Sequence, residues 1–225
     1  MSSTPTLNSE LQAELFSVYQ FYAALTRNLD PVQGLGGQLL WAAELDADGC
    51  RLVRAANIAG AASLSASADI PAQKHAIHEG VVDFMVNSLD EALRILKNQI
   101  RKREAVAVGI SAAPELIVQQ MIERGVLADL LPPAVGDENT IAEFLVQGAE
   151  RIELQPLPSQ SVFVAFAQPP PDFEALAHAL LSEDDHAIRR WLRLSPRYLG
   201  PHARRIRSLC CDQRIATQLT NSLTR

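Results

Sequence analysis

The chain has 225 residues, of which 48% are hydrophobic and 20% charged, so it can bury a sizeable core and is too apolar for general disorder. No apolar run reaches the roughly 20 residues that a membrane-spanning helix needs, and the N-terminus lacks the pattern of a signal peptide. We therefore expect a soluble, cytoplasmic protein with no membrane partner. The three cysteines, Cys50, Cys210 and Cys211, form neither a disulfide framework nor a metal-ligand spacing, so no metal site is expected.

The first 135 residues alternate between amphipathic segments and short apolar runs. Apolar residues at helical spacing predict helices, and unbroken apolar runs bounded by turn residues predict buried strands. In chain order these segments are a helix over 9–29, a strand over 38–45, a helix over 51–60, a strand over 61–66, a helix over 71–80, a strand over 81–86, a helix over 89–100, a strand over 105–110, a helix over 114–125 and a strand over 128–131.

Local residue choices support these assignments. Ser9 is a plausible cap for the first helix, Gly60 permits a left-handed end for the second, and Ser88 with Glu91 forms a capping box. The run over 105–110 shows no polar alternation, which is typical of a parallel strand covered on both faces. The alternation as a whole predicts an α/β fold with a doubly wound, mostly parallel, Rossmann-like sheet. Such folds bind ligands at the carboxyl ends of the strands.

The composition shifts after Pro132-Pro133. A helix near 138–148, strands near 151–155 and 161–167, and three arginine-rich helices to the end predict a second, smaller unit. We therefore divide the chain into a Rossmann-type domain over 9–135 and a smaller unit, α/β to α-helical, over 136–225.

The last forty residues, 186–225, carry nine arginines and one acid, Asp212, although the whole chain has a net charge of −6. A nucleic-acid surface would pair arginines with exposed aromatic rings, and only Trp191 and Tyr198 could serve. We favour solvated helix faces, or contact with the acidic remainder of the chain or with a second subunit. A homodimer is expected, and nucleic-acid binding is kept as a further alternative.

A collinear series of segments resembles the urocanase family. The strongest stretches, AANIAGAASLSASADIPAQKHAIHEGVVDFMVNSLDEAL (55–93) and VGISAAPELIVQQMIERGV (108–126), are similar to the family's Rossmann-type cofactor domain. Further segments resemble its first helix, its first strand and pieces of its catalytic core: 15–25, 36–45, 162–167, 186–194 and 203–223. The resemblance implies a hydro-lyase that hydrates urocanate in histidine breakdown and uses tightly bound NAD as an electrophile.

The family's glycine-rich phosphate turn is replaced by acids in this chain. The turn after the first predicted strand contains Glu44, Asp46 and Asp48, with only Gly49 remaining. A carboxylate about 5 Å from a phosphate repels it by about 3 kcal/mol at an effective dielectric near 20. The GLGG run at 34–37 precedes the strand, whereas phosphate binding needs glycines between strand and helix. We therefore expect no cofactor.

The other family positions have also changed. By resemblance, Ser67 stands where the family binds the adenosine ribose, and Ala72 and 112–114 replace further polar cofactor contacts. The remaining candidates for binding a cofactor are Ser67, Gly109 and Ser111.

The resemblance extends to the family's catalytic core. There, the family's active-site cysteine aligns with Arg207 of this chain, and its substrate-binding arginine aligns with Val162. A small shift in register would instead bring Cys210 or Cys211 to the cysteine position, with Arg204 and Arg205 as candidate partners.

Two other groupings have simpler interpretations. His75 and His78 could share a helix face, but no third metal ligand accompanies them. Glu183, Asp184 and Asp185 suit the start of the following helix, where negative charge interacts favourably with the helix dipole.

The sequence thus predicts a non-catalytic, urocanase-like protein that serves as a small-molecule-binding or protein-interaction module. The alternative is a lyase or hydratase with an altered site, which would retain NAD.

Overall fold

The computed structural model describes residues 8–27, 30–133 and 138–223. Its helices and strands in chain order are α1 (Ser9–Leu25), β1 (Leu39–Glu44), α2 (Ala47–Ala59), β2 (Ala62–Ala66), α3 (Ile70–His78), β3 (Phe84–Val86), α4 (Leu89–Lys102), β4 (Val106–Ile110), α5 (Pro114–Glu123), β5 (Leu130–Leu131), α6 (Glu138–Val146), β6 (Glu150–Arg151), β7 (Ser161–Ala167), α7 (Phe173–Leu180), α8 (His186–Tyr198), β8 (Ile206–Asp212) and α9 (Gln213–Leu223). Within the described residues, no helix combines the length and apolar character needed to cross a bilayer.

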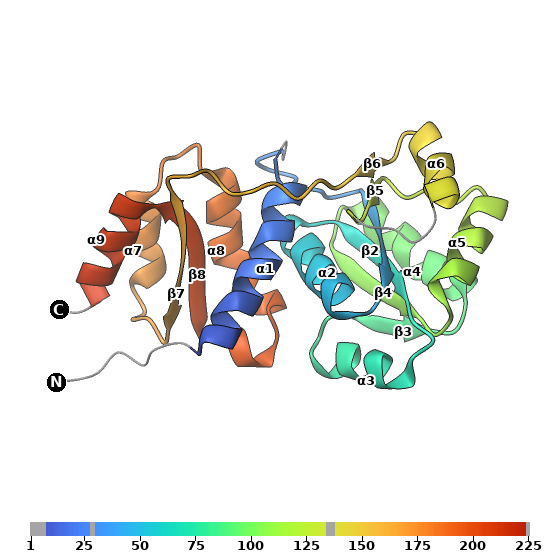
Figure 1. The fold of residues 1–225 in the computed structure, drawn as a ribbon, viewed down its shortest axis with the longest axis horizontal. Coiled ribbons are helices and arrows are strands. Elements are labelled where there is room, and N and C mark those ends of the chain that lie inside the picture. Colours follow the sequence, from blue (N-terminus) through green and yellow to red (C-terminus); the bar gives the residue numbers. More distant parts are fainter. Residues whose placement is uncertain (1–7, 28–29, 134–137, 224–225) are drawn as a thin grey trace.

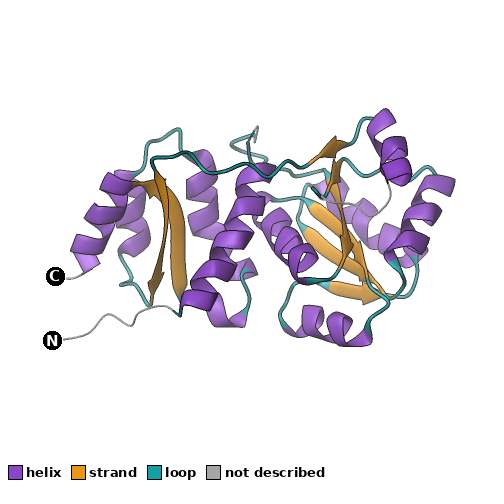
Figure 2. Ribbon diagram, in the orientation of Figure 1, coloured by secondary structure: helices purple, strands orange, loops and turns teal. Residues whose placement is uncertain are grey.

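The predicted parallel sheet is confirmed. Six strands lie in the order β3-β4-β2-β1-β5-β6, all pairs are parallel, and helices connect them (Figure 2). From β1 the chain moves to β2 on one side, and from β4 it returns to place β5 on the other side of β1. The winding direction therefore reverses between β1 and β5, and such a reversal opens a crevice at the carboxyl ends of the two strands.

Alternate residues of the central strands enter two separate cores. Leu40 and Ala42 of β1 pack with α1 and α2 on one face, whereas Leu39 and Trp41 pack with α4, α5 and α6 on the other. Figure 1 shows the resulting three layers, with the sheet between the two groups of helices. Burial on both faces explains why the central strands are unbroken apolar runs.

The helix boundaries follow their caps. Gly60 ends α2 in the left-handed conformation with φ 99°, as predicted, and the Ser88 hydroxyl accepts a hydrogen bond from the Glu91 amide. Two boundaries differ from the sequence analysis. Asn8, not Ser9, caps α1, and α2 begins at Ala47 because the Asp46 carboxylate caps it several residues earlier than expected.

The C-terminal part contains a strand where the sequence analysis predicted only helices. β8 pairs with β7 in an antiparallel two-stranded sheet, in register from Ser161 opposite Asp212 to Ala167 opposite Ile206. Three α-helices, α7, α8 and α9, follow residue 171 as predicted, but α7 contains no arginine, and the prediction missed strand β8 between α8 and α9. The residues of β7 that stabilise this strand lie between 39 (Ala167 to Ile206) and 51 (Ser161 to Asp212) positions away, so no local sequence pattern could indicate the pairing.

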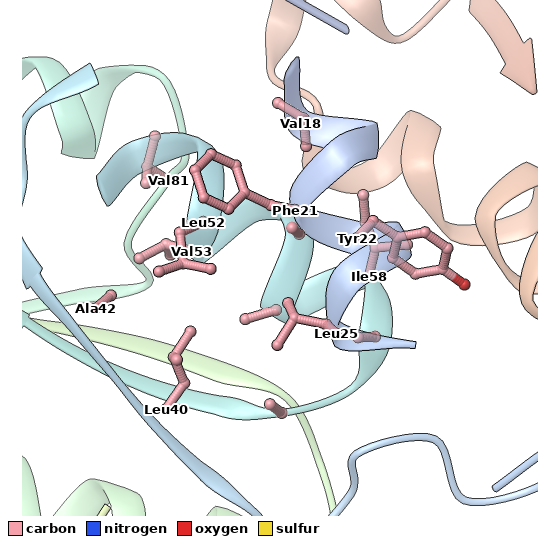
Figure 3. Close-up of a cluster of buried hydrophobic side chains, with 14 of the residues drawn as sticks. Val18, Phe21, Tyr22, Leu25, Leu40, Ala42, Leu52, Val53, Ile58 and Val81 are labelled. Atoms are coloured by element: carbon pink, nitrogen blue, oxygen red, sulfur yellow. The ribbon is translucent and has the colours of Figure 1, made fainter. Parts of the chain in front are cut away.

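Helix α1 lies between α2 and the β7–β8 sheet and contacts both (Figure 1). Phe21 points toward Leu52 and Val53 of α2, whereas Tyr22 points the other way (Figure 3). The Tyr22 hydroxyl donates to the Ala187 carbonyl over 2.7 Å, and the Trp191 ring lies 5.1 Å from that of Tyr22. The two sheets are thus joined through one continuous core.

Candidate functional site

A cavity of about 1000 Å³ opens at the carboxyl ends of β1 and β5, where the strand order reverses. Its walls come from the end of β1, the first turn of α2, one side of α5, the segment after β5, and single residues of α1 and α6. Ala43, in this wall, has a φ of 58°, and the register of β1 against β2 shifts there. A non-glycine residue in this conformation is a local strain of the kind that occurs at binding sites.

The acidic turn predicted from the sequence forms part of this wall. The Asp46 carboxylate accepts a hydrogen bond from the Gly49 amide over 2.8 Å, and the Glu44 carboxylate accepts one from the Leu45 amide over 3.1 Å. Asp48 lies 2.8 Å from Arg51. A bound phosphate in a Rossmann fold would use the amides at the start of this helix, but here the Asp46 carboxylate already occupies one of them, the Gly49 amide.

Three further carboxylates, which the sequence analysis missed, approach the same cavity from other elements. Glu115 and Glu123 come from the two ends of α5, and Glu143 comes from α6. They lie far along the chain from the acidic turn, so only the parallel topology brings them to one place. With Glu44, Asp46 and Asp48 they give the cavity six acids, and none of the described residues that line it is basic.

The predicted cofactor-binding residues are occupied by internal contacts. Ser67 is fully buried, and its hydroxyl accepts from the Asp69 amide while its carbonyl accepts from the Gln73 side chain. The Ser111 hydroxyl donates to the same Gln73 over 3.1 Å. The space beside Gly109 is filled by Met85, whose side chain would lie 2.8 Å from an added Cβ. These residues close the ends of β2 and β4 and do not line the cavity.

The predicted catalytic candidates do not converge. Cys210 and Cys211 are adjacent on β8, so their side chains point to opposite faces and enter different cores. Arg204 and Arg205 are exposed before the other end of that strand, and four residues separate Arg205 from Cys210, a span of roughly 17 Å in extended conformation. Burial raises the pKa of the Cys210 thiol, although hydrogen bonds to Tyr19 and Ser161 oppose it, and burial raises the pKa of Cys211 to about 11.

We expect all three cysteines to react slowly with a thiol reagent in the native protein. Burial also raises the pKa of Cys50 to about 11, so at neutral pH its thiolate fraction falls by roughly a hundredfold or more relative to a free thiol. Release of thionitrobenzoate from Ellman's reagent, with and without denaturant, measures this. The native rate should still be rising between pH 8 and 9, where an ordinary thiol begins to level off. One rapidly reacting thiol at pH 7 would contradict the expectation.

The histidine pair and the acidic cluster considered in the sequence analysis do not form a site among the described residues. His75 and His78 are both exposed on α3, and among the described residues no three His, Cys, Asp or Glu side chains converge in a way that could hold a metal ion. The three acids 183–185 precede α8, as the sequence analysis predicted. The Asp185 carboxylate accepts from the Ser182 amide over 2.9 Å, which stabilises the turn that leads into the helix.

Several arginines of the C-terminal part are bound within the molecule. Arg190 donates to the Ile58 carbonyl over 2.8 Å at the end of α2, Arg189 donates to the Leu181 carbonyl, and Arg207 lies 2.6 Å from Glu174. Trp191 is fully buried, and Arg197 stacks over the ring of Tyr198. The two aromatic rings are therefore not displayed as a stacking platform for bases.

The parallel sheet, its reversal beside β1 and the cavity at that point together define a Rossmann-like α/β protein. A family model described as the urocanase Rossmann-like domain matches residues 18–149, more than half of the chain. The chain belongs to the urocanase family.

Proposed function

We propose that this chain is a non-catalytic member of the urocanase family, a small-molecule-binding module that does not hold NAD. The observation that carries the proposal is the hydrogen bond that the Gly49 amide donates to the Asp46 carboxylate. It lies at the helix start, where a diphosphate would bind. The same proposal includes the cytoplasmic location and the homodimer expected from the sequence.

Electrostatics support the exclusion of NAD. A dinucleotide carries two negative charges on its diphosphate, and Glu44, Asp46 and Asp48 all line the cavity beside the start of α2. Each carboxylate within about 5 Å of a phosphate is unfavourable by about 3 kcal/mol at an effective dielectric near 20. Arg51 offsets only part of this repulsion, because its single positive charge is shared between Asp48 and Glu14, which lies 2.6 Å from it.

The arrangement of nucleophiles supports the absence of catalysis. A thiol acts as a nucleophile in its thiolate form, which needs an electropositive and accessible surrounding. Cys210 and Cys211 are each only 4% exposed, and burial raises the pKa of both. They also lie on β8, outside the cavity at the carboxyl ends of β1 and β5. The described residues thus keep both thiols away from the cavity, which supports the proposal that the chain is non-catalytic.

Mass spectrometry of the purified protein tests the proposal directly. Small molecules released by denaturation should contain no stoichiometric NAD, and NADH added to the native protein should show no saturable change in fluorescence. Urocanate mixed with the protein should keep its ultraviolet absorbance over hours. A stoichiometric dinucleotide, or loss of the urocanate absorbance that depends on protein concentration, would overturn the proposal.

A further inference from the structure

A basic surface lies at one end of the β7–β8 sheet, where the end of β7 lies opposite the start of β8. Two hollows of about 320 and 330 Å³ meet there, and both are lined by Gln168, Arg204 and Arg205. The first hollow is also lined by residues 169–171, the start of α7 and Arg207. None of these described residues belongs to the wall of the cavity at β1 and β5, so the two places are separate.

The charge of this surface is opposite to that of the chain as a whole. The described residues that line the two hollows include three arginines and His202, against one acid, Glu174. Glu174 is already paired with Arg207, whose Nε lies 2.6 Å from its carboxylate. The guanidinium groups of Arg204 and Arg205 are exposed and have no hydrogen-bond or ion-pair partner among the described residues. Two adjacent positive charges therefore remain uncompensated in a chain whose net charge is −6.

A second observation is that the protein itself holds Arg207 in position. Its Nε donates to the Glu174 carboxylate, and its Nη1 donates to the carbonyl oxygens of Arg204 and Ile206, each over 3.1 Å. Its Nη2 is accessible and has no hydrogen-bond partner among the described residues. A donor whose direction is already fixed loses little conformational freedom when it binds an anion.

The walls of the first hollow are also fixed. The three consecutive prolines at 169–171 have restricted φ angles. Gln168, with a φ of 53°, donates its backbone amide to the Arg205 carbonyl over 3.1 Å. The Phe173 amide donates to the Pro170 carbonyl over 3.0 Å, which ties the proline segment to the start of α7. The hollow is therefore formed before a ligand enters, as is usual for small-molecule sites.

We propose that the first hollow binds the phosphate group of a small phosphomonoester. Such a group carries close to two negative charges at neutral pH, which balance the uncompensated charges of Arg204 and Arg205. Guanidinium groups match phosphate oxygens with paired hydrogen bonds, and Nη2 of Arg207 adds a donor of fixed direction. A carboxylate has a single charge and would leave one arginine uncompensated. The proline side chains give the organic part of the ester an apolar wall.

The size and lining of the first hollow favour a small ester over a nucleic acid. Its volume of about 320 Å³ lies at the lower end of the range for small-molecule sites. Surfaces that bind nucleic-acid strands use exposed aromatic rings to stack the bases. Among the described residues that line this hollow, the aromatic side chain is that of Phe173, which is only 1% exposed.

Phenyl phosphate is the probe, with inorganic phosphate and benzoate as comparison ligands. In isothermal titration calorimetry at neutral pH and low salt, phenyl phosphate should bind saturably with one site per chain, and its affinity should fall as salt rises. Inorganic phosphate should compete with it but bind more weakly, because it lacks the organic group. Benzoate, which has the same ring and one charge, should bind roughly tenfold more weakly.

Paired variants test the arginines. R204Q/R205Q should weaken phenyl phosphate roughly tenfold, since each exposed ion pair contributes a few-fold in affinity. R94Q/R101Q, which removes two exposed arginines of α4 outside both hollows, should leave the affinity unchanged. R204K/R205K keeps both charges and loses the paired geometry, so it should recover only part of the affinity. Thermal unfolding of each variant shows whether its fold is retained.

The outcomes separate this inference from the proposed function, beyond which it goes. Absence of saturable binding by phenyl phosphate, or equal losses in R204Q/R205Q and R94Q/R101Q, would overturn the site. Equal affinity for inorganic phosphate would overturn the ester, and equal affinity for benzoate would overturn the requirement for two charges. A mixed-sequence oligonucleotide that binds more tightly and displaces the probe would assign the surface to nucleic acid instead. A dinucleotide released from the purified protein would overturn the proposed function and leave this site standing.

Discussion

Replacing Trp191 with alanine is expected to lower the free energy of unfolding by about 4 kcal/mol. Trp191 is fully buried, and its ring makes edge contact with Tyr19 at a centroid distance of 4.9 Å. Its indole N–H donates to the Ser208 carbonyl over 2.8 Å. The substitution therefore removes a large apolar volume, two aromatic contacts and a hydrogen bond between α8 and β8. Urea unfolding followed by circular dichroism would measure the change.

Two further variants show which part of Trp191 matters. Trp191→Phe keeps most of the ring volume and loses the donor, so it should lower the free energy of unfolding by about 1–3 kcal/mol. Val146→Ala alters an apolar side chain that is 87% exposed and should stay within about 0.5 kcal/mol of the parent protein. A change below 1 kcal/mol for Trp191→Ala would mean that α1 and α8 are not coupled through this ring.

The parallel sheet could be predicted because short stretches of the sequence determine its strands and the ends of its helices. The run over 105–110 is apolar without alternation, and Gly60, Ser88 and Pro114 lie at helix ends where their backbone or side-chain chemistry fits. Strand β8 contains only one arginine, Arg207, and was missed because the arginines on either side of it are spaced as in helices. Its strand conformation depends on β7, and only the folded molecule brings the two together.

The candidate site was predictable in part for the same reason. Glu44, Asp46 and Asp48 belong to one strand–turn–helix connection, so a single stretch of sequence reveals their charge. Glu115 and Glu143 come from α5 and α6, and their approach to that turn follows from the position of β5 beside β1. No pattern in the sequence could show that the Trp41 donor finds no acceptor among the described residues, because this depends on the folded core.

The second large effect is expected at Gly49, the glycine that remains in the acidic turn. Gly49 lies in the first turn of α2, where helix propensity alone would favour alanine by up to about 1 kcal/mol. A Cβ at this position, however, would overlap the backbone carbonyl oxygen of Glu44, which cannot move away as a flexible side chain can. We therefore expect Gly49→Ala to destabilise the protein by about 3 kcal/mol, the upper range for overpacking.

Gly80→Ala is the matched control for Gly49→Ala. Gly80 has a φ of 64° and nothing within 4 Å of an added Cβ, so its substitution should lower the free energy of unfolding by only about 1–2 kcal/mol through backbone strain. Urea unfolding of both variants measures these effects. If Gly49→Ala stabilised the protein, helix propensity would dominate, and the close approach of β1 to α2 would not constrain the site.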